Sequence, residues 1–121
     1  MTGENAYELF KKGSTLLEQG DFMAASVPLE RARSLEPDKG SIREALGRAY
    51  FRSGQFERAR EEFEAVVERA PTNDFALFCL GRSLMLLGRH KEARKPLALA
   101  AQLRPERHDY RLYRERAAKA A

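Results

Sequence analysis

The chain has 121 residues, 43% of them hydrophobic and 33% charged, a length that fits one compact domain or a short array of repeats and excludes a two-domain enzyme. No apolar run approaches the ~20 residues that a membrane-spanning helix needs. One cysteine and two histidines cannot form an internal disulfide or an ordinary structural zinc site, so we expect no cofactor and no metal. The first residues lack the pattern of a secretory signal, and we expect a cytoplasmic protein.

The formal net charge of +4 lies mostly at the C-terminal end. Residues 1–103 carry 16 basic and 15 acidic side chains, whereas residues 104–121 carry six basic and three acidic ones. Nucleic-acid-binding domains usually show a basic patch or stripe. The nearly neutral body therefore disfavours nucleic acid as the main partner, and a short basic tail remains to be explained.

Several kinds of residue recur every 34 positions, which indicates internal repeats. Each suits a place in a pair of antiparallel helices: a small residue where helices approach closely, glycine where a helix ends, and proline where a helix cannot continue. The recurring sets are Pro37, Pro71 and Pro105; Gly13, Gly47 and Gly81; Gly20, Gly54 and Gly88; and Ala25, Ala59 and Ala93.

The first repeat, residues 6–39, is predicted to form two helices separated by Gly20. Asp21 is a suitable N-cap for the second of them. Pro28 lies inside this second helix, as Pro96 does in the third repeat. We expect each proline to bend its helix without breaking it, because the apolar pattern resumes directly afterwards.

The second repeat, residues 40–73, shows a helical apolar pattern over residues 41–53, an end signal at Gly54, and a second helix from Phe56 towards Pro71. Three carboxylates of this second helix lie near two arginines at helical spacing. We interpret them as a solvent-exposed ion-pairing surface. The residues concerned are Glu61, Glu62 and Glu64 with Arg58 and Arg60.

The third repeat, residues 74–107, is followed by a predicted helix over about residues 108–120. A stack of helix pairs leaves its last apolar face open, and a terminal helix with one polar face can cover that face. We expect Leu112, Tyr113 and Ala117 to face the preceding pair. The outward side chains would then be Arg111, Arg114, Glu115 and Lys119, which accounts for the basic tail.

The small, large and proline positions over residues 6–107 resemble three tandem tetratricopeptide repeats. The resemblance implies an all-α, right-handed solenoid of three antiparallel helix pairs plus a capping helix, forming one domain over residues 1–121. Three departures from the family pattern occur. The first large position, often Trp in the family, is Leu9, Arg43 and Leu77, and the apolar position before the first glycine is Lys12 in repeat one. His90 replaces the aromatic residue seen at Phe22 and Phe56. The matching residues are Gly13, Leu16, Ala25, Leu29, Ala32 and Pro37; Leu46, Gly47, Tyr50, Ala59, Phe63 and Pro71; and Leu80, Gly81, Leu84, Ala93, Leu97 and Pro105.

Members of this family hold a partner on the concave side formed by the first helix of each repeat. Transferring the family's groove positions to this chain gives a set of candidate peptide-binding residues. They are Tyr7, Phe10, Lys11 and Ser14; Ser41, Glu44, Ala45, Arg48 and Arg52; Phe75, Phe78, Cys79, Arg82 and Met85; and Tyr113 and Arg116.

The best-known groove pattern of the family binds the acidic carboxyl terminus of heat-shock chaperones through two lysines, two asparagines and an arginine. At those five places this chain has Phe10, Ser14, Ala45, Phe75 and Cys79. None of the five matches, so the resemblance does not extend to a chaperone-tail clamp.

The candidate groove offers aromatic residues and a column of arginines, Arg48, Arg82 and Arg116, spaced by 34 residues. Guanidinium groups make charge-assisted contacts with carboxylates or phosphates, and aromatic side chains supply apolar burial. Two local alternatives remain open: Arg48 could pair with Glu44 one turn earlier, and Arg82 could stack on Phe78.

The chain shows no combination of residues that indicates an enzyme. The spacing of His90 and His108 does not allow either of them to act as a catalytic partner of the other or of Cys79. We interpret Cys79 as a small apolar residue of the groove wall. We therefore predict a non-enzymatic adaptor that binds a peptide segment with acidic and apolar residues, extended or helical. Two alternatives are a self-associating structural subunit and a nucleic-acid-associated protein that uses the basic tail.

Overall fold

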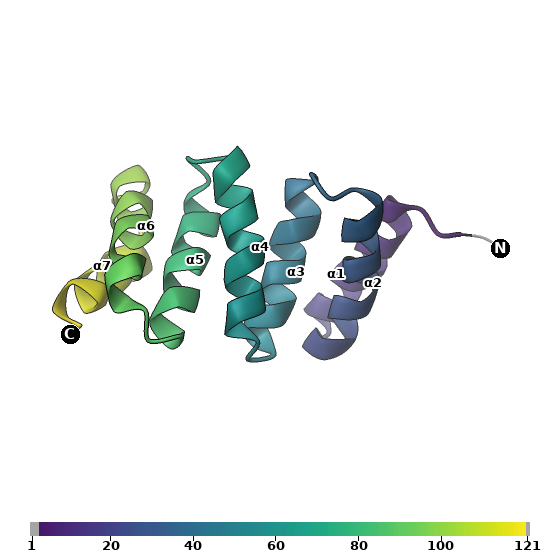
Figure 1. Ribbon diagram of the computed structural model, residues 1–121, viewed down its shortest axis with the longest axis horizontal. Helices are drawn as coiled ribbons and strands as arrows, with labels where there is room; N and C mark the ends of the chain where they lie inside the picture. Colours follow the sequence, from purple (N-terminus) through teal and green to yellow (C-terminus); the bar gives the residue numbers. More distant parts are fainter. Residues whose placement is uncertain (1–2, 121) are drawn as a thin grey trace.

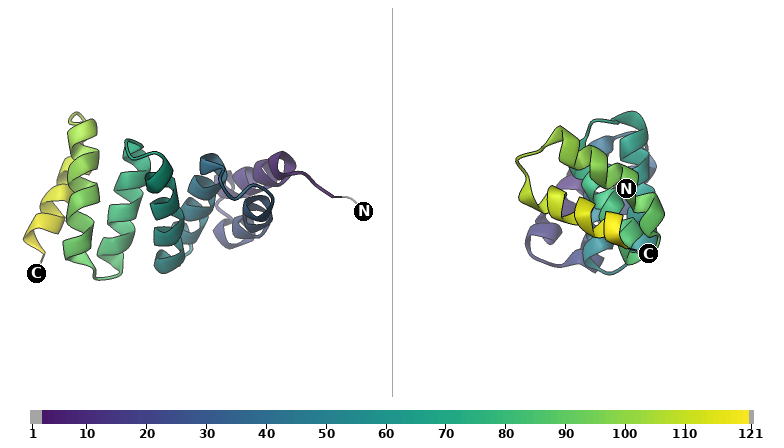
Figure 2. Two further views of the ribbon diagram at one scale, coloured as in Figure 1. Left: turned by 45° about the horizontal axis from the view of Figure 1, so that its top comes forward. Right: turned by 90° about the vertical axis from the view of Figure 1, so that its left-hand side faces the viewer.

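The computed structural model describes residues 3–120, and these residues form seven helices. In Figures 1 and 2 the helices stand side by side in an elongated stack, with the two ends of the chain at opposite ends of the stack. The first helices are α1 (Ala6–Glu18), α3 (Gly40–Arg52) and α5 (Asp74–Leu86); the second helices are α2 (Phe22–Leu35), α4 (Phe56–Arg69) and α6 (His90–Leu103); and α7 (His108–Lys119) ends the array. Among the described residues, no helix is long and apolar enough to cross a bilayer.

Each helix pair packs closely because a glycine of its first helix meets a large side chain of its second helix. A Cβ atom at Gly13 would lie 2.4 Å from Cγ of Leu29, and one at Gly81 would lie 2.4 Å from Cγ of Leu97. At Gly47 the nearest atom would be Cζ of Phe63, at 2.8 Å. These distances are too short for any side chain larger than hydrogen without displacement of the neighbour, which explains the first glycine column.

The second glycine column ends the first helix of each pair. Gly54 has φ +81°, and its N–H donates to the carbonyl of Phe51 (3.1 Å), while the N–H of Gln55 donates to that of Tyr50 (2.8 Å). This is the Schellman arrangement, in which a left-handed residue closes the helix. Gly20 and Gly88 repeat it with φ +79° and +77°. The predicted helix ends are thus confirmed.

Prolines mark the ends of the second helices and are tolerated within two of them. Helix α4 ends at Arg69, two residues before Pro71, because a residue that precedes proline is displaced from helical backbone geometry. Pro28 and Pro96 lie inside α2 and α6, which run unbroken for 14 residues each. Asp21 is the N-cap residue of α2, as predicted, although its side chain makes no capping hydrogen bond.

Helix α7 covers the C-terminal face of α5 and α6 through a residue that the sequence analysis did not name. Tyr110 and Ala117 are fully buried, whereas Leu112 and Tyr113 are half-buried. The ring of Tyr110 packs on Phe78 with centroids 4.5 Å apart, and its hydroxyl donates to Asp74 Oδ2 (2.7 Å). The amphipathic helix was predicted, but its main anchor is Tyr110.

The carboxylates of α4 do not form one exposed surface. Glu64 pairs with Arg60 at 3.0 Å on the outside of the helix, as predicted. Glu62 is only 3% exposed and binds Arg33 of α2 and Arg43 of α3, the latter at 3.1 Å. The expectation of a solvated Glu62 is therefore wrong. A buried carboxylate lowers stability unless it is paired with a cation, and two neighbouring helices each provide an arginine.

Candidate functional site

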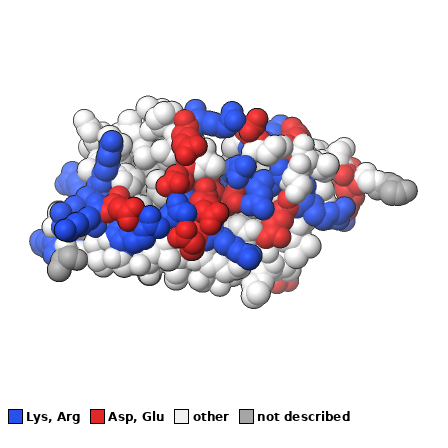
Figure 3. Space-filling model, in the orientation of Figure 1, with Lys and Arg blue, Asp and Glu red and all other residues white. Residues whose placement is uncertain are grey.

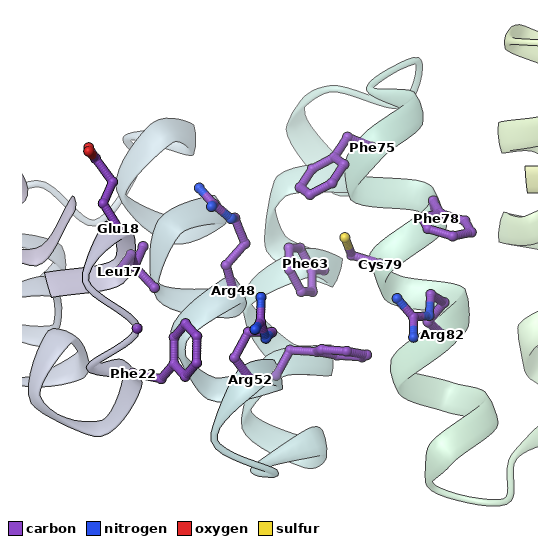
Figure 4. Close-up of a pocket in the computed structure, with 12 residues that line it drawn as sticks. Leu17, Glu18, Phe22, Arg48, Arg52, Phe63, Phe75, Phe78, Cys79 and Arg82 are labelled. Atoms are coloured by element: carbon purple, nitrogen blue, oxygen red, sulfur yellow. The ribbon is translucent and has the colours of Figure 1, made fainter. Parts of the chain in front are cut away.

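Residues of all three first helices line a cavity of about 370 Å³, shown in Figure 4. We call it the central groove. Its wall comes from the end of α1, the start of α2, the middle and end of α3, one residue of α4, and α5. The lining residues are Leu17, Glu18, Gly20, Phe22, Arg48, Phe51, Arg52, Phe63, Phe75, Phe78, Cys79 and Arg82.

Six of the candidate residues line the central groove together: Arg48, Arg52, Phe75, Phe78, Cys79 and Arg82. All six come from α3 and α5, because the 34-residue period brings equivalent positions of successive first helices to the same side of the stack. Three of the six are arginines, whereas Glu18 is the only acidic residue among the described residues that line the groove. The groove is therefore positive.

The candidate residues of α1 do not line the central groove. Tyr7 and Phe10 border a separate cavity of about 290 Å³ beside Ser41, and Tyr7 is 66% exposed. The Lys11 ammonium lies 5.2 Å from the centroid of the Tyr7 ring, and Ser14 is half-buried. This part of the first helix thus forms a second, smaller recess.

The remaining candidates contact other residues around the central groove. The Asn73 side chain donates from Nδ2 to Glu44 Oε2 (3.2 Å), so Glu44 does not pair with Arg48 as one alternative suggested. Met85 Sδ lies 3.4 Å from Nδ1 of His90. Tyr113 meets Phe78 edge to face at 5.5 Å, and Arg116 lies over the Tyr113 ring at 4.9 Å.

The aromatic side chains of the groove are more packed than expected. Phe78 is only 6% exposed, because it lies between Tyr110 and Tyr113 of α7. Phe75 is half-buried and faces the cavity in Figure 4. The expected open aromatic floor is thus partly a packed wall, and α7 completes it.

Sequence reasoning missed three aromatic residues of the central groove, Phe22, Phe51 and Phe63. Phe51 stands one period before Met85, which was named, so the register could have found it. Phe22 was not among the candidate residues, yet the guanidinium carbon of Arg52 lies 4.4 Å from the centroid of its ring. The fold brings this residue, which belongs to the start of a second helix, into the groove.

The thiol of Cys79 is unsuited to nucleophilic chemistry. Burial raises its pKa to about 12, and the charge of Glu44 acts in the same direction. The thiol is therefore protonated at neutral pH, and only the thiolate is a strong nucleophile. No group of three or more His, Cys, Asp and Glu that could hold a metal occurs among residues 3–120.

Arginines of the basic tail are largely engaged within the chain. Arg107 pairs with Asp109 at 2.7 Å, Arg104 lies 3.6 Å from both Asp74 and Glu106, and Arg111 donates to the carbonyl of Pro105. Arg116 stacks on Tyr113. In the face shown in Figure 3, this end of the molecule is mainly basic, with an acidic patch beside the basic side chains. These contacts agree with a capping helix.

Comparison with known proteins identifies the repeats. A sequence model described as tetratricopeptide repeat matches residues 10–74 and 44–108. No curated protein matches the chain in sequence.

Solved structures share the fold. The first tetratricopeptide repeat domain of Spaghetti (RPAP3) bound to the HSP90 peptide SRMEEVD has a TM-score of 0.89 and 20% identity, covering 99% of this chain and 95% of that chain. The Arabidopsis OM64 domain has a TM-score of 0.89 and 18% identity, with 96% of each chain covered. A double mutant of MamA RS-1 has a TM-score of 0.89 and 22% identity, covering 93% of this chain and 63% of that one. With the family match over most of its length and the period, glycine contacts and helix order described above, the chain belongs to the tetratricopeptide repeat family.

Proposed function

We propose that the chain is a non-enzymatic protein-interaction module that binds a peptide segment, containing acidic and apolar residues, in the central groove. The observation that carries this proposal is the composition of the groove: three arginines and five phenylalanines stand beside one carboxylate. Arginine orients carboxylates through charge-assisted hydrogen bonds, while partly exposed aromatic surface gains free energy when a ligand covers it.

A peptide complex of a protein with the same fold supports the proposal in general terms. Spaghetti (RPAP3) is bound to SRMEEVD, a peptide with three acidic residues. The present chain has Phe10, Ser14, Ala45, Phe75 and Cys79 at the places that bind such chaperone tails in the family pattern. We therefore expect a different acidic and apolar peptide as the ligand, and SRMEEVD serves as a control peptide that binds weakly.

Selection from a phage library of random peptides tests the proposal. We expect enriched sequences that combine acidic and bulky apolar residues, and at least ~10-fold weaker binding by an Arg48→Glu/Arg82→Glu variant, because two groove charges are reversed. The matched control, Arg114→Glu/Lys119→Glu, reverses the same number of charges on α7 outside the groove and should bind normally. A library that yields no sequence, or equal losses in both variants, would overturn the proposal.

A second candidate function, self-association, is favoured by the outer surface of the first repeat. Met23 and Val27 of α2 are 69% and 60% exposed. The equivalent positions of α4 are Glu57 and Glu61, so the apolar surface is specific to this end of the array. Sedimentation velocity at increasing concentration tests it: a mass that rises for the wild type and stays monomeric for Val27→Glu would support a homo-oligomer.

A further inference from the structure

Arg82 is held differently from every other arginine of the central groove. Its guanidinium carbon lies 4.7 Å from the ring centroid of Tyr113, 5.0 Å from that of Phe51 and 5.7 Å from that of Phe78. The three rings belong to α7, α3 and α5, so three helices fix one side chain. Figure 4 shows Arg82 on the wall of the cavity, across from Arg48 and Phe22.

The charge of Arg82 has no anionic partner among residues 3–120. Its Nε atom is buried and makes no hydrogen bond, and its guanidinium forms no ion pair with a described carboxylate. Glu44, an acid of the neighbouring helix α3 that does not line the groove, accepts a hydrogen bond from Asn73 instead. A buried N–H without an acceptor and a cation without a counterion both lower stability, which favours an anion supplied from outside.

The other two arginines of the same column lack this arrangement. Arg48 is exposed, and no ring lies under its guanidinium among the described residues. Arg116 is exposed on α7 and stacks on one ring, and it does not line the central groove. An arginine whose plane is already fixed loses less conformational entropy when it binds a carboxylate than a mobile one does.

We propose that Arg82 is the anion-binding point of the groove, where its guanidinium receives one side-chain carboxylate of the peptide ligand. This inference rests on the proposed peptide-binding function and specifies which residue recognises the acid. The apolar neighbour of that acid is received by Phe22, Phe51 and Phe75, which line the same cavity of about 370 Å³. The ligand is thus an acidic residue adjacent to a bulky apolar residue, and Arg48 adds only long-range attraction.

A double-mutant cycle on a selected peptide tests the assignment. The peptide is synthesised with its acidic residue as Glu, as Gln and as phosphoserine, and each form is titrated against wild type, Arg82→Met and Arg116→Met. Methionine keeps a flexible apolar side chain against the three rings and removes the charge. We expect Arg82→Met to weaken the Glu peptide ~10-fold or more and the Gln peptide less than ~2-fold, because only the charged pair is lost.

Arg116→Met is the matched control, since it removes the same charge from the same register position one repeat later. It should change binding of the Glu peptide by less than ~2-fold. Equal weakening of the Glu and Gln peptides by Arg82→Met would show that Arg82 only supports the fold, and unchanged binding would show that it is not in contact; either result overturns the proposal. Tighter binding of the phosphoserine form through Arg82 would overturn the carboxylate assignment.

A measurement on the wild type keeps the test valid even where Arg82→Met fails to fold. In ¹⁵N spectra, the Nε–H signal of Arg82 should shift on addition of the Glu peptide and stay in place with the Gln peptide. A library that yields no peptide overturns the proposed function itself. Selected peptides that bind without shifting this signal overturn only the role of Arg82.

Discussion

The two junctions between neighbouring repeats hold chemically opposite residues at the same register. Between the first and second repeats, Arg33, Arg43 and Glu62 form a partly buried ion cluster. One period later, the equivalent positions are Val67, Leu77 and Pro96. Leu77, only 2% exposed, belongs to the apolar core with Val67 packed against that core, and Pro96 is buried. The helix bounds of the two repeats are nevertheless the same, shifted by 34 residues.

The glycine and proline columns thus set the geometry of each helix pair, while the junction between repeats can hold either apolar side chains or an ion cluster. The two kinds of junction differ in the stability that is lost when one member is replaced. Apolar groups tolerate the loss of one member with a moderate cost, whereas a carboxylate removed from between two arginines leaves two unpaired cations. Replacement of Glu62 should therefore reveal the difference in stability between the two junctions most clearly.

Replacement of Glu62 by Leu should have the largest effect on stability. We expect a loss of ~3 kcal/mol in the free energy of unfolding, at the lower end of the range for broken buried pairs because the side chains of Arg33 and Arg43 are 31% and 26% exposed. Urea denaturation followed by circular dichroism measures it. The control is Glu64→Leu, whose partner Arg60 keeps a second carboxylate in Glu57, and which should change stability by less than ~1 kcal/mol.

Converting the first junction into the second should restore the lost stability. The triple variant Arg33→Val/Arg43→Leu/Glu62→Pro carries the residues of the later junction, and proline at this helical position is already tolerated at Pro96. Replacement of a complete ion cluster by apolar residues is often neutral or stabilising, so its unfolding midpoint should lie near that of the wild type. A triple variant as unstable as Glu62→Leu would show that the two junctions are not interchangeable.

Substitution of the buried glycines should have an intermediate effect that differs between the two repeats. Gly81→Ala places a Cβ 2.4 Å from the branching carbon of Leu97, whereas Gly47→Ala meets the edge of the Phe63 ring at 2.8 Å. We expect a loss of ~2 kcal/mol for Gly81→Ala and a smaller loss for Gly47→Ala, after allowing for the helix propensity of alanine. Thermal unfolding of both variants checks the order; equal midpoints would contradict it.

The sequence predicts the fold well because its signals are local and repeated. Gly54 ends a helix with a positive φ, and Gly47 leaves room for the side chain of the paired helix. Every helix pair has these two requirements, so the 34-residue period alone located the helix ends and the close contacts. The burial of Glu62 and its pairing with two arginines could not be predicted in this way. Its cations come from α2 and α3, 29 and 19 residues away in sequence, and only packing shows that they converge.

The groove was predicted in part for the same reason. Arg48 and Arg82 follow the column of first-helix positions, so the register placed both at the cavity. Phe22 enters the groove from the start of a second helix, and Tyr110 fixes α7 by a hydrogen bond to Asp74, 36 residues away. Neither contact leaves a periodic signal, because each depends on how one helix pair is rotated against the next.

The smallest effect that separates the junctions is a dependence of stability on alkaline pH. Tyr50 of the first junction donates a hydrogen bond to Glu30, and burial together with this bond raises its pKa from 10.0 to about 12. Because the folded state favours the neutral phenol, the contribution of Tyr50 is complete below pH 10 and is lost as the pH rises through 12. The equivalent residue of the second junction, Leu84, does not titrate.

Comparison of Tyr50→Phe with Tyr110→Phe isolates this contribution, since burial and Asp74 raise the pKa of Tyr110 as well. We expect the unfolding midpoint of the wild type to fall between pH 9 and pH 11.5, and each variant to show a shallower fall because one of the two buried phenols no longer has to ionise against its carboxylate. Urea midpoints at four pH values in this interval measure the slope. A Tyr50→Phe slope equal to that of the wild type would mean that the first junction opens before Tyr50 ionises, so that its ion cluster rather than its phenol limits stability at high pH.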